Sequence, residues 1–378
     1  MSAFIKTFEV GPQDRPSAPT IAIKDSIDIA GCATTAASRA LADAPPAARH
    51  AQVVQRLIDA GWRIAGKTNM HELAFGMTGI NDVSGTPPNP QDPALIPGGS
   101  SSGSASAVGD GLVDAALGTD TGGSVRCPAA CCGVIGLKPT FGRVSRDGVA
   151  PRETTLDCVG PFARDMNTII DVMLAIDPSF QPGKARRDAS KARVAIIDVE
   201  ADDDISRAVA GAMERAGVAT RKVRLESMKD AFVAGLAVIN AETWRAFGHL
   251  IASGKLGADI DARLRAAANT SAADLDAAER VRRAFTDEVD RTLEEAEVIV
   301  LPTMPSLPIT LDAAREGTSV IAMSSLIRPF NLSGHPALTL PIPIEQSRMK
   351  AGLQIVGRKG RDEMVCSVAA FIEAMLQT

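Results

Sequence analysis

The chain has 378 residues, of which 45% are hydrophobic and 22% charged, and these ordinary globular values exclude a disordered or fibrous protein. Its 40 basic and 45 acidic residues give a net charge of -5, without the basic surplus of a nucleic-acid binder, so we expect no nucleic-acid partner. No apolar run reaches about 18 residues and residues 1–10 lack a signal pattern, so we expect a cytoplasmic protein with no membrane partner.

The first third of the chain alternates predicted strands and helices. Residues 20–24 (TIAIK) have the β-branched and small apolar pattern of a buried strand, and Lys24 stands at its end. Residues 47–60 carry apolar side chains at helical spacing. Residues 63–65 suit a short strand, and Asn69 followed by Glu72 resembles a capping box that begins a helix through Phe75. This alternation favours an α/β fold with a largely buried sheet.

The rest of the chain divides into a strand-and-loop region, a helical region and a closing strand-and-helix region. The predicted strands are residues 113–117, 133–137, 298–301 and 337–341, and the predicted helices are residues 205–216, 229–247, 272–295 and 364–376. Alanine and charged residues dominate residues 203–297, which we interpret as a helical insertion. We therefore predict a single domain, 1–378, in which this insertion interrupts the sheet-forming core.

The first unusual loop is residues 97–106, PGGSSSGSAS. Its composition is typical of a flexible linker. Its place inside a dense α/β pattern, and the small residues that follow it, favour a tightly packed helix instead. Composition alone leaves both interpretations open.

The second loop is residues 118–128, GTDTGGSVRCP, which follows a predicted strand. A strand that enters a Gly-Gly-Ser turn and then a helix directs consecutive backbone N–H groups at one point, as an oxyanion requires. The alternative is an ordinary tight turn in which Ser124 caps the helix.

The cysteines give no indication of a metal site. Cys127, Cys131 and Cys132 cluster, but no Cys/His pair follows at the spacing of a zinc finger. We expect reduced, buried thiols and no metal.

Taken together with Lys24, the two loops resemble the amidase signature family of Ser-Ser-Lys hydrolases. That family's motif runs from GGSS, here 98–101, through a small-residue helix to GxDTGGSxRxP, here 118–128. Further matches are IKD at 23–25, GKTNM at 66–70, GTPPNP at 85–90, CGVIGLKPTFGRVS at 132–145, NLSGHPALTLPI at 331–342 and GLQIVG at 352–357. The resemblance covers about 20–165 and 298–375, and it implies a mixed, mostly buried central sheet flanked by helices.

The resemblance also implies a role for individual residues. Ser124 would be the nucleophile, Ser100 the bridging serine after a cis peptide at Gly99, and Lys24 the general base. Lys67 does not align with the catalytic lysine. Since an ordinary lysine is protonated at pH 7, Lys24 must lose its proton in the resting enzyme, and burial favours that loss. No metal or organic cofactor is implied.

Charge that develops on the carbonyl oxygen needs hydrogen-bond donors, and the glycines of the second loop place them. The expected donors are the backbone N–H groups of Thr121, Gly122, Gly123 and Ser124. The expected supporting residues are Gly99, Ser101, Asp120 and Arg126; for the last two we favour a bracing role, through hydrogen bonds and a salt bridge, over substrate contact.

The predicted function is an amidase that hydrolyses a small linear amide or ureido substrate through an acyl-enzyme on Ser124, releasing ammonia or an amine. One alternative is the glutaminase-type subunit of a tRNA-dependent amidotransferase, which would need a partner protein. The other is a non-catalytic binding homologue, against which the intact Lys24, Ser100 and Ser124 argue. Family members usually carry helices ahead of the catalytic lysine, and Lys24 lies near the start of this chain. We therefore expect exposed apolar surface and a homodimer.

Overall fold

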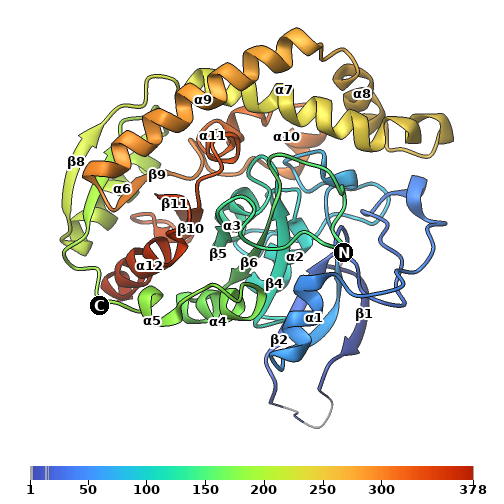
Figure 1. The fold of residues 1–378 in the computed structure, drawn as a ribbon, viewed down its shortest axis with the longest axis horizontal. Helices are drawn as coiled ribbons and strands as arrows, with labels where there is room; N and C mark the ends of the chain where they lie inside the picture. The colour runs from blue at the N-terminus through green and yellow to red at the C-terminus, as the bar shows by residue number, and fades with distance from the viewer. Residues whose placement is uncertain (1–2, 13–14, 16, 378) are drawn as a thin grey trace.

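The structure is a computed structural model that describes residues 3–12, 15 and 17–377. Within these residues, eleven strands form one mixed sheet in the order β1-β3-β2-β4-β6-β5-β10-β11-β9-β7-β8 (Figure 1). The strands are β1 (Phe4–Val10), β2 (Thr20–Lys24), β3 (Arg63–Thr68), β4 (Ala115–Asp120), β5 (Ile135–Lys138), β6 (Cys158–Ala163), β7 (Arg193–Ile197), β8 (Ala219–Val223), β9 (Val298–Pro302), β10 (Ala337–Pro343) and β11 (Lys350–Gly357). The predicted α/β fold with a mixed central sheet is confirmed.

Helices cover both faces of the sheet. They are α1 (Gln52–Asp59), α2 (Ser102–Gly109), α3 (Arg126–Cys132), α4 (Met166–Ile176), α5 (Pro182–Ala185), α6 (Asp203–Ala216), α7 (Met228–Phe247), α8 (Ala258–Ala267), α9 (Ala272–Glu295), α10 (Leu311–Arg315), α11 (Arg328–Leu332) and α12 (Asp362–Gln377). Short 3-10 turns occur at Arg39–Leu41, Glu72–Ala74, Gly248–Ser253 and Ile321–Ser324. Figure 1 shows α7, α8 and α9 along one side of the molecule and α1, α4, α5 and α12 along the opposite side. Across the described ranges, no helix is long and apolar enough to cross a membrane.

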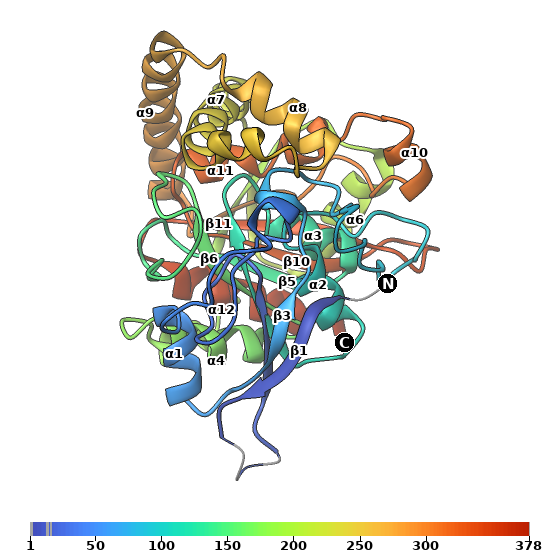
Figure 2. The same cartoon turned by 90° about the vertical axis from the view of Figure 1, so that its right-hand side faces the viewer.

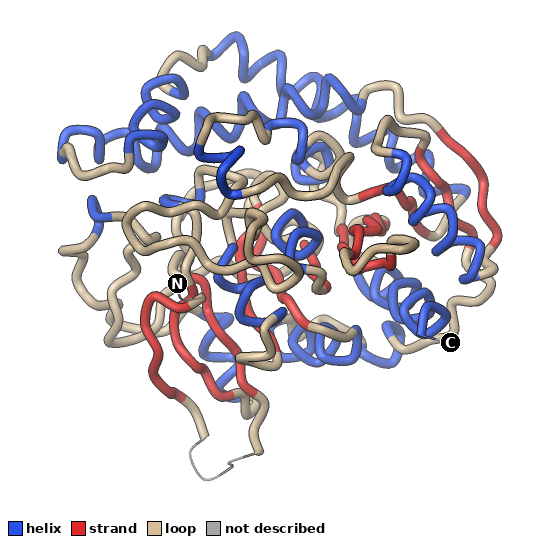
Figure 3. The backbone as a smooth tube through the Cα atoms, turned by 180° about the vertical axis from the view of Figure 1, so that it is seen from behind, coloured by secondary structure: helices blue, strands red, loops and turns tan. Residues whose placement is uncertain are grey.

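When the molecule is turned or seen from behind (Figures 2 and 3), helices lie on either side of the central strands, while the edge strands β1 and β8 are mostly exposed. One core lies between the sheet and α1, α4, α6 and α12, and it takes the side chains of Ile21 and Ile23 from β2. A second core lies under α2 and α3, and it takes Ala22 from the other face of the same strand. Because side chains alternate along a strand, Lys24 falls on the Ala22 face, where α2 packs. β2 is an inner strand that runs parallel to both of its neighbours, β3 and β4. Lys24 therefore extends from an inner strand of the sheet, and it is fully buried.

The segment of small residues after Gly99 is a buried helix, not a linker. In α2, residues 102–108 are all buried against the sheet. A Cβ atom at Gly103 would lie 2.3 Å from the carbonyl oxygen of Ala3 and 2.5 Å from the backbone nitrogen of Asn69. Only a glycine permits this approach, so the serines and glycines here serve close packing.

The helix predicted to begin at Asn69 does not form. Residues Glu72–Ala74 make one 3-10 turn, and Leu73 has a positive φ of 52° that ends any helical run. The Asn69 side chain binds the carbonyl oxygens of Ser84 and Gly85 instead of capping a helix. The Glu72 carboxylate accepts hydrogen bonds from Ser38 and from the backbone of Gly257, so it cannot complete a capping box.

The predicted helical insertion, 203–297, contains one strand. Helices α6, α7 and α9 form where they are predicted, but β8 pairs in parallel with β7 at the edge of the sheet. Its sequence, ATRKV, is mostly exposed and carries two cations, Arg221 and Lys222. Charged side chains are common on edge strands, where they discourage pairing with other chains, and they hide the strand pattern from sequence analysis.

Candidate active site

Lys24 and Ser100 lie together at the end of β2. The Lys24 Nζ atom is 2.7 Å from Ser100 Oγ and 2.8 Å from Thr119 Oγ1, with the Thr119 carbonyl oxygen at 3.5 Å. Lys24 and Ser100 are fully buried and Thr119 is nearly so. The peptide bond between Gly99 and Ser100 is cis. This arrangement holds the amine against a serine hydroxyl with no intervening side chain.

Burial changes the acid–base behaviour of Lys24. Removal from water lowers the pKa of its amine from 10.5 to about 7, although the charges of Asp157 and Asp120 act in the opposite direction. Desolvation therefore outweighs the attraction of two nearby carboxylates. Near neutral pH a substantial fraction of this lysine is an unprotonated amine that can accept a proton.

Ser124 lies in the turn between β4 and α3 and is 4% exposed. Its carbonyl oxygen accepts a hydrogen bond from the Ser101 N–H at 3.3 Å, which ties this turn to the segment that carries Ser100. The Ser101 hydroxyl lies 3.2 Å from the carbonyl oxygen of Thr119 and 3.3 Å from its nitrogen, and so fixes the end of β4. Within the described residues the Ser124 hydroxyl has no hydrogen-bond partner, so it is not committed to a structural contact.

The two glycines before Ser124 lie close to neighbouring side chains, and the positive φ of Gly123 also favours glycine there. A Cβ atom at Gly122 would lie 2.8 Å from Ile239 Cδ1, and one at Gly123, where φ is 119°, would lie 2.2 Å from Ile327 Cδ1. The Gly123 N–H donates to Asp120 Oδ1 at 2.7 Å. The expectation that Gly123 is a free donor is therefore wrong, because this carboxylate already occupies it. The N–H groups of the other three predicted donors, Thr121, Gly122 and Ser124, donate to no group in the described part of the chain.

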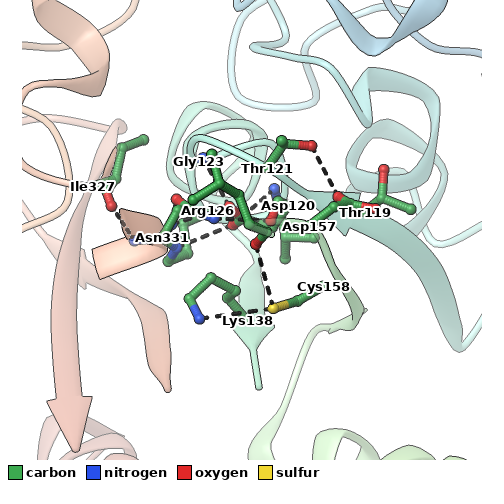
Figure 4. A network of polar contacts seen from close by, with 12 residues as sticks. Thr119, Asp120, Thr121, Gly123, Arg126, Lys138, Asp157, Cys158, Ile327 and Asn331 are labelled. Atoms are coloured by element: carbon green, nitrogen blue, oxygen red, sulfur yellow. Dashed lines mark hydrogen bonds and ion pairs between the residues drawn. The ribbon is translucent and has the colours of Figure 1, made fainter. Parts of the chain in front are cut away.

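Asp120 and Arg126 form a buried ion pair under the turn (Figure 4). Arg126 Nε and Nη2 each lie 3.0 Å from a different Asp120 oxygen, and Asn331 binds both residues. Arg126 also donates to Gln354 and to the carbonyl oxygen of Ile327. Burial alone would raise the pKa of Asp120, but the charge and hydrogen bonds of Arg126 hold it well below its usual range. Asp120 is therefore ionised and braces the turn.

We expect Arg126→Gln to lower the free energy of unfolding by about 3–5 kcal/mol, because it leaves the Asp120 carboxylate buried without its counter-ion. Chemical denaturation measures this change. Arg265→Gln is the matched control, since Arg265 pairs with Asp261 on the exposed surface of α8 and should have little effect. Equal stability of the two variants would contradict the bracing role.

Lys67 is engaged elsewhere. Its Nζ atom lies 3.0 Å from Asp25 Oδ1 and 2.9 Å from both the Ala33 carbonyl oxygen and Thr34 Oγ1. The lysine is buried in this ion pair, which links β3 to the loop after β2. Its amine is paired with a carboxylate, whereas Lys24 forms no ion pair with any described residue.

Thr119 is a site residue that the sequence pattern did not single out. It stands inside GTDTGGS as a polar residue at the end of a buried strand, and that position was the available signal. No group of three or more His, Cys, Asp or Glu side chains in the described part of the molecule is arranged to hold a metal.

The family model for amidases matches residues 20–366, so this chain belongs to the amidase family, the family that carries the amidase signature. An archaeal relative, one of the subunits of glutamyl-tRNA(Gln) amidotransferase from Methanospirillum hungatei, is 34% identical over 97% of this chain and 95% of that protein. Allophanate hydrolase of Kluyveromyces lactis is 28% identical with a TM-score of 0.85, over 95% of this chain and 62% of that one. A structure from a vestigial protein complex, described as revealing the origins of an s-triazine catabolic enzyme, is 27% identical with a TM-score of 0.88, over 97% and 85% of the two chains.

These relatives correct the expectation about partners. Several of them, from archaea and bacteria, carry the same name, that of one component of an amidotransferase for glutamyl-tRNA(Gln). The expectation of no nucleic-acid partner, drawn from net charge, is therefore wrong for proteins of this kind. Net charge fails here because an enzyme that works within a complex need not carry a basic surplus of its own. The designation of these relatives as components of a complex also leaves the expected homodimer without support.

Proposed function

We propose that the chain hydrolyses a carboxamide through an acyl-enzyme on Ser124, with Lys24 as general base and Ser100 between them. The observation that supports this most directly is the 2.7 Å contact between Lys24 Nζ and Ser100 Oγ in a site closed to solvent. The lowered pKa of Lys24, about 7, gives the amine the proton affinity that a base needs at neutral pH.

The contacts of Lys24 support a route for the proton. A neutral amine has two hydrogens and one lone pair, and Thr119 offers two acceptors, Oγ1 and the carbonyl oxygen. The amine can donate both hydrogens to Thr119 and direct its lone pair at the hydroxyl of Ser100. Ser100 then gives its proton to Lys24 and takes one from Ser124, as Ser124 Oγ forms a bond to the carbonyl carbon.

The reverse movement completes acyl transfer. The proton returns through Ser100 to the leaving nitrogen as the C–N bond breaks, and ammonia or an amine departs. Water, activated by the same lysine, then hydrolyses the ester on Ser124. The N–H groups of Thr121, Gly122 and Ser124 are the proposed donors to the oxyanion, and the loss of one such donor typically costs about 2.7–4 kcal/mol.

We expect kcat/KM to rise with pH through about 7, because only the neutral form of Lys24 is a base and its pKa is about 7. Initial rates on an uncharged amide between pH 5.5 and 9 measure the profile. A rate that stays flat across this range, or that falls as pH rises through 7, would contradict the role of Lys24.

A more specific candidate is favoured by the relatives: the glutaminase-type subunit of a tRNA-dependent amidotransferase. The glutamyl-tRNA(Gln) amidotransferase relatives align with nearly the whole chain at 34% and 32% identity. In this candidate the amide of glutamine is cleaved on Ser124, and the ammonia passes to a partner protein. A small linear amide or ureido compound is the other candidate, which the likeness to allophanate hydrolase supports.

Ammonia release separates the two candidates. The chain is tested on L-glutamine and on a panel of small amides and ureido compounds, with Ser124→Ala as the blank, and is then purified from its own host through an affinity tag. Preference for glutamine together with a co-purified second chain supports the amidotransferase candidate. Efficient turnover of a small amide by the chain alone supports the stand-alone hydrolase.

A further inference from the structure

Arg328 is a buried arginine that has no acidic partner among the residues that the structure describes. The residue is 6% exposed, and its guanidinium lies over the Phe232 ring with 4.3 Å from Cζ to the ring centroid. Nη2 donates to Ser324 Oγ at 2.7 Å and Nη1 reaches the Phe232 carbonyl oxygen at 3.4 Å. Nε is buried without any hydrogen-bond partner among the described residues. Buried arginines are normally paired with carboxylates, so this one has unused donors and an unbalanced charge.

The neighbouring Arg126 is a buried arginine whose charge and hydrogen-bond donors are all matched by protein groups. It binds Asp120 through two nitrogens and three further acceptors complete its contacts. At Arg328, by contrast, burial lowers the pKa of the guanidinium to about 10, and no carboxylate among the described residues raises it again. Arg126 has a carboxylate partner, whereas Arg328 has none within the described ranges.

The unused donor faces the loop that carries Ser124. A Cβ atom at Gly122 would lie 3.7 Å from Arg328 Nε, so the guanidinium lies against the backbone of that residue. Gly122 precedes Ser124 by two positions, which places their Cα atoms within about 7 Å. Ile239, from α7, contacts the same face of Gly122 and makes the surroundings apolar. A cation with no counter-ion among the described residues therefore lies against the loop that carries the proposed nucleophile.

We infer that Arg328 binds a carboxylate of the substrate, so that the enzyme acts on amides that carry a carboxylate a few bonds from the scissile carbonyl. A guanidinium has five N–H donors, of which the two protein contacts use two, and its planar fork matches a carboxylate. The carboxylate of the substrate would supply the negative charge that balances the Arg328 guanidinium. The inference rests on the proposed amide hydrolysis, and it applies to both candidate functions, since glutamine also carries a carboxylate.

Matched pairs of amides test this inference. Succinamate and glutaramate carry a carboxylate, and 4-methylpentanamide and 5-methylhexanamide replace it with an uncharged group of the same shape. We expect the wild type to prefer each charged amide by at least tenfold. Arg328→Gln should lose about 10- to 100-fold in kcat/KM on the charged amides, which corresponds to one charge-assisted hydrogen bond. The fold-loss on the uncharged amides should be at least ten times smaller than the fold-loss on the charged ones.

The control is Arg245→Gln, which removes an exposed arginine from α7 and should leave both rates unchanged. Equal losses of Arg328→Gln on charged and uncharged amides would show a structural role and overturn the inference. So would a wild type that does not distinguish the members of a pair.

Calorimetry with glutarate and succinate gives a readout that does not depend on turnover. We expect binding to the wild type and to Ser124→Ala, weakened at least tenfold in Arg328→Gln. If Arg328→Gln does not fold, the wild type alone decides: binding of neither dicarboxylate at millimolar concentration overturns the inference. Arg328-dependent binding without hydrolysis of any amide would refute the proposed function and support the carboxylate site. Hydrolysis of amides without a preference for the charged ones would support the proposed function and refute the carboxylate site.

Discussion

Ser124→Ala should reduce kcat by about 10⁴- to 10⁶-fold while the protein stays folded. The proposed nucleophile has no substitute, because Ser100 is held on Lys24 and Ser101 is bonded to Thr119. The loss of the hydroxyl removes no hydrogen bond between described residues, so stability should hardly change. Ammonia release measures the rate, and thermal denaturation checks the fold.

Ser106→Ala is the matched control for that variant. Ser106 is buried in α2, and its hydroxyl has no partner in the described part of the chain. The same substitution at this position should leave the rate close to that of the wild type. If purified Ser124→Ala kept more than about a tenth of the activity, the nucleophile would have to be another residue.

Lys24→Ala should lose about 10²- to 10⁴-fold in kcat/KM, the usual contribution of a general base. Without the amine, Ser100 has no group to receive its proton within the site, and only hydroxide from solvent can replace it. The residual rate should therefore keep rising with pH above 7, where the wild type levels off. Steady-state rates across this pH range distinguish the two profiles.

Lys67→Ala is the comparison that makes the assignment of Lys24 specific. Lys67 is also a buried lysine, but it is paired with Asp25 at 3.0 Å. Its loss should lower the free energy of unfolding by about 3–5 kcal/mol, because Asp25 is left buried and unpaired. The folded fraction should keep its activity. If Lys67→Ala lost more activity than Lys24→Ala on the same substrate, the base would be misassigned.

Short motifs with strong local constraints were predictable from the sequence. The β2 strand, the Gly-Gly-Ser turn and helices such as α9 follow from apolar periodicity and from residues with one dominant structural role. The pairing of Lys24 with Ser100 was reached through family resemblance, because the two residues are 76 positions apart and no local pattern joins them.

Features that depend on tertiary contacts were not predictable. Asn69 looks like a helix cap until the 84–85 backbone is placed beside it. The commitment of the Gly123 N–H to Asp120 depends on how the turn closes. Arg328 gave no sequence signal at all, since an arginine is notable only once the structure shows it buried without a carboxylate partner in the described part of the chain. Partner chains lie outside what composition and net charge can establish.

The acyl-enzyme itself offers the most direct test of catalysis through Ser124. The enzyme is mixed with excess amide, quenched in acid within the first turnovers, and analysed by intact mass and by peptide mapping. We expect a mass increase equal to the acyl group, on the peptide that contains Ser124, in the wild type and not in Ser124→Ala. An adduct on any other residue, or turnover with no adduct under conditions where deacylation is slowed at low pH, would contradict Ser124 as the nucleophile.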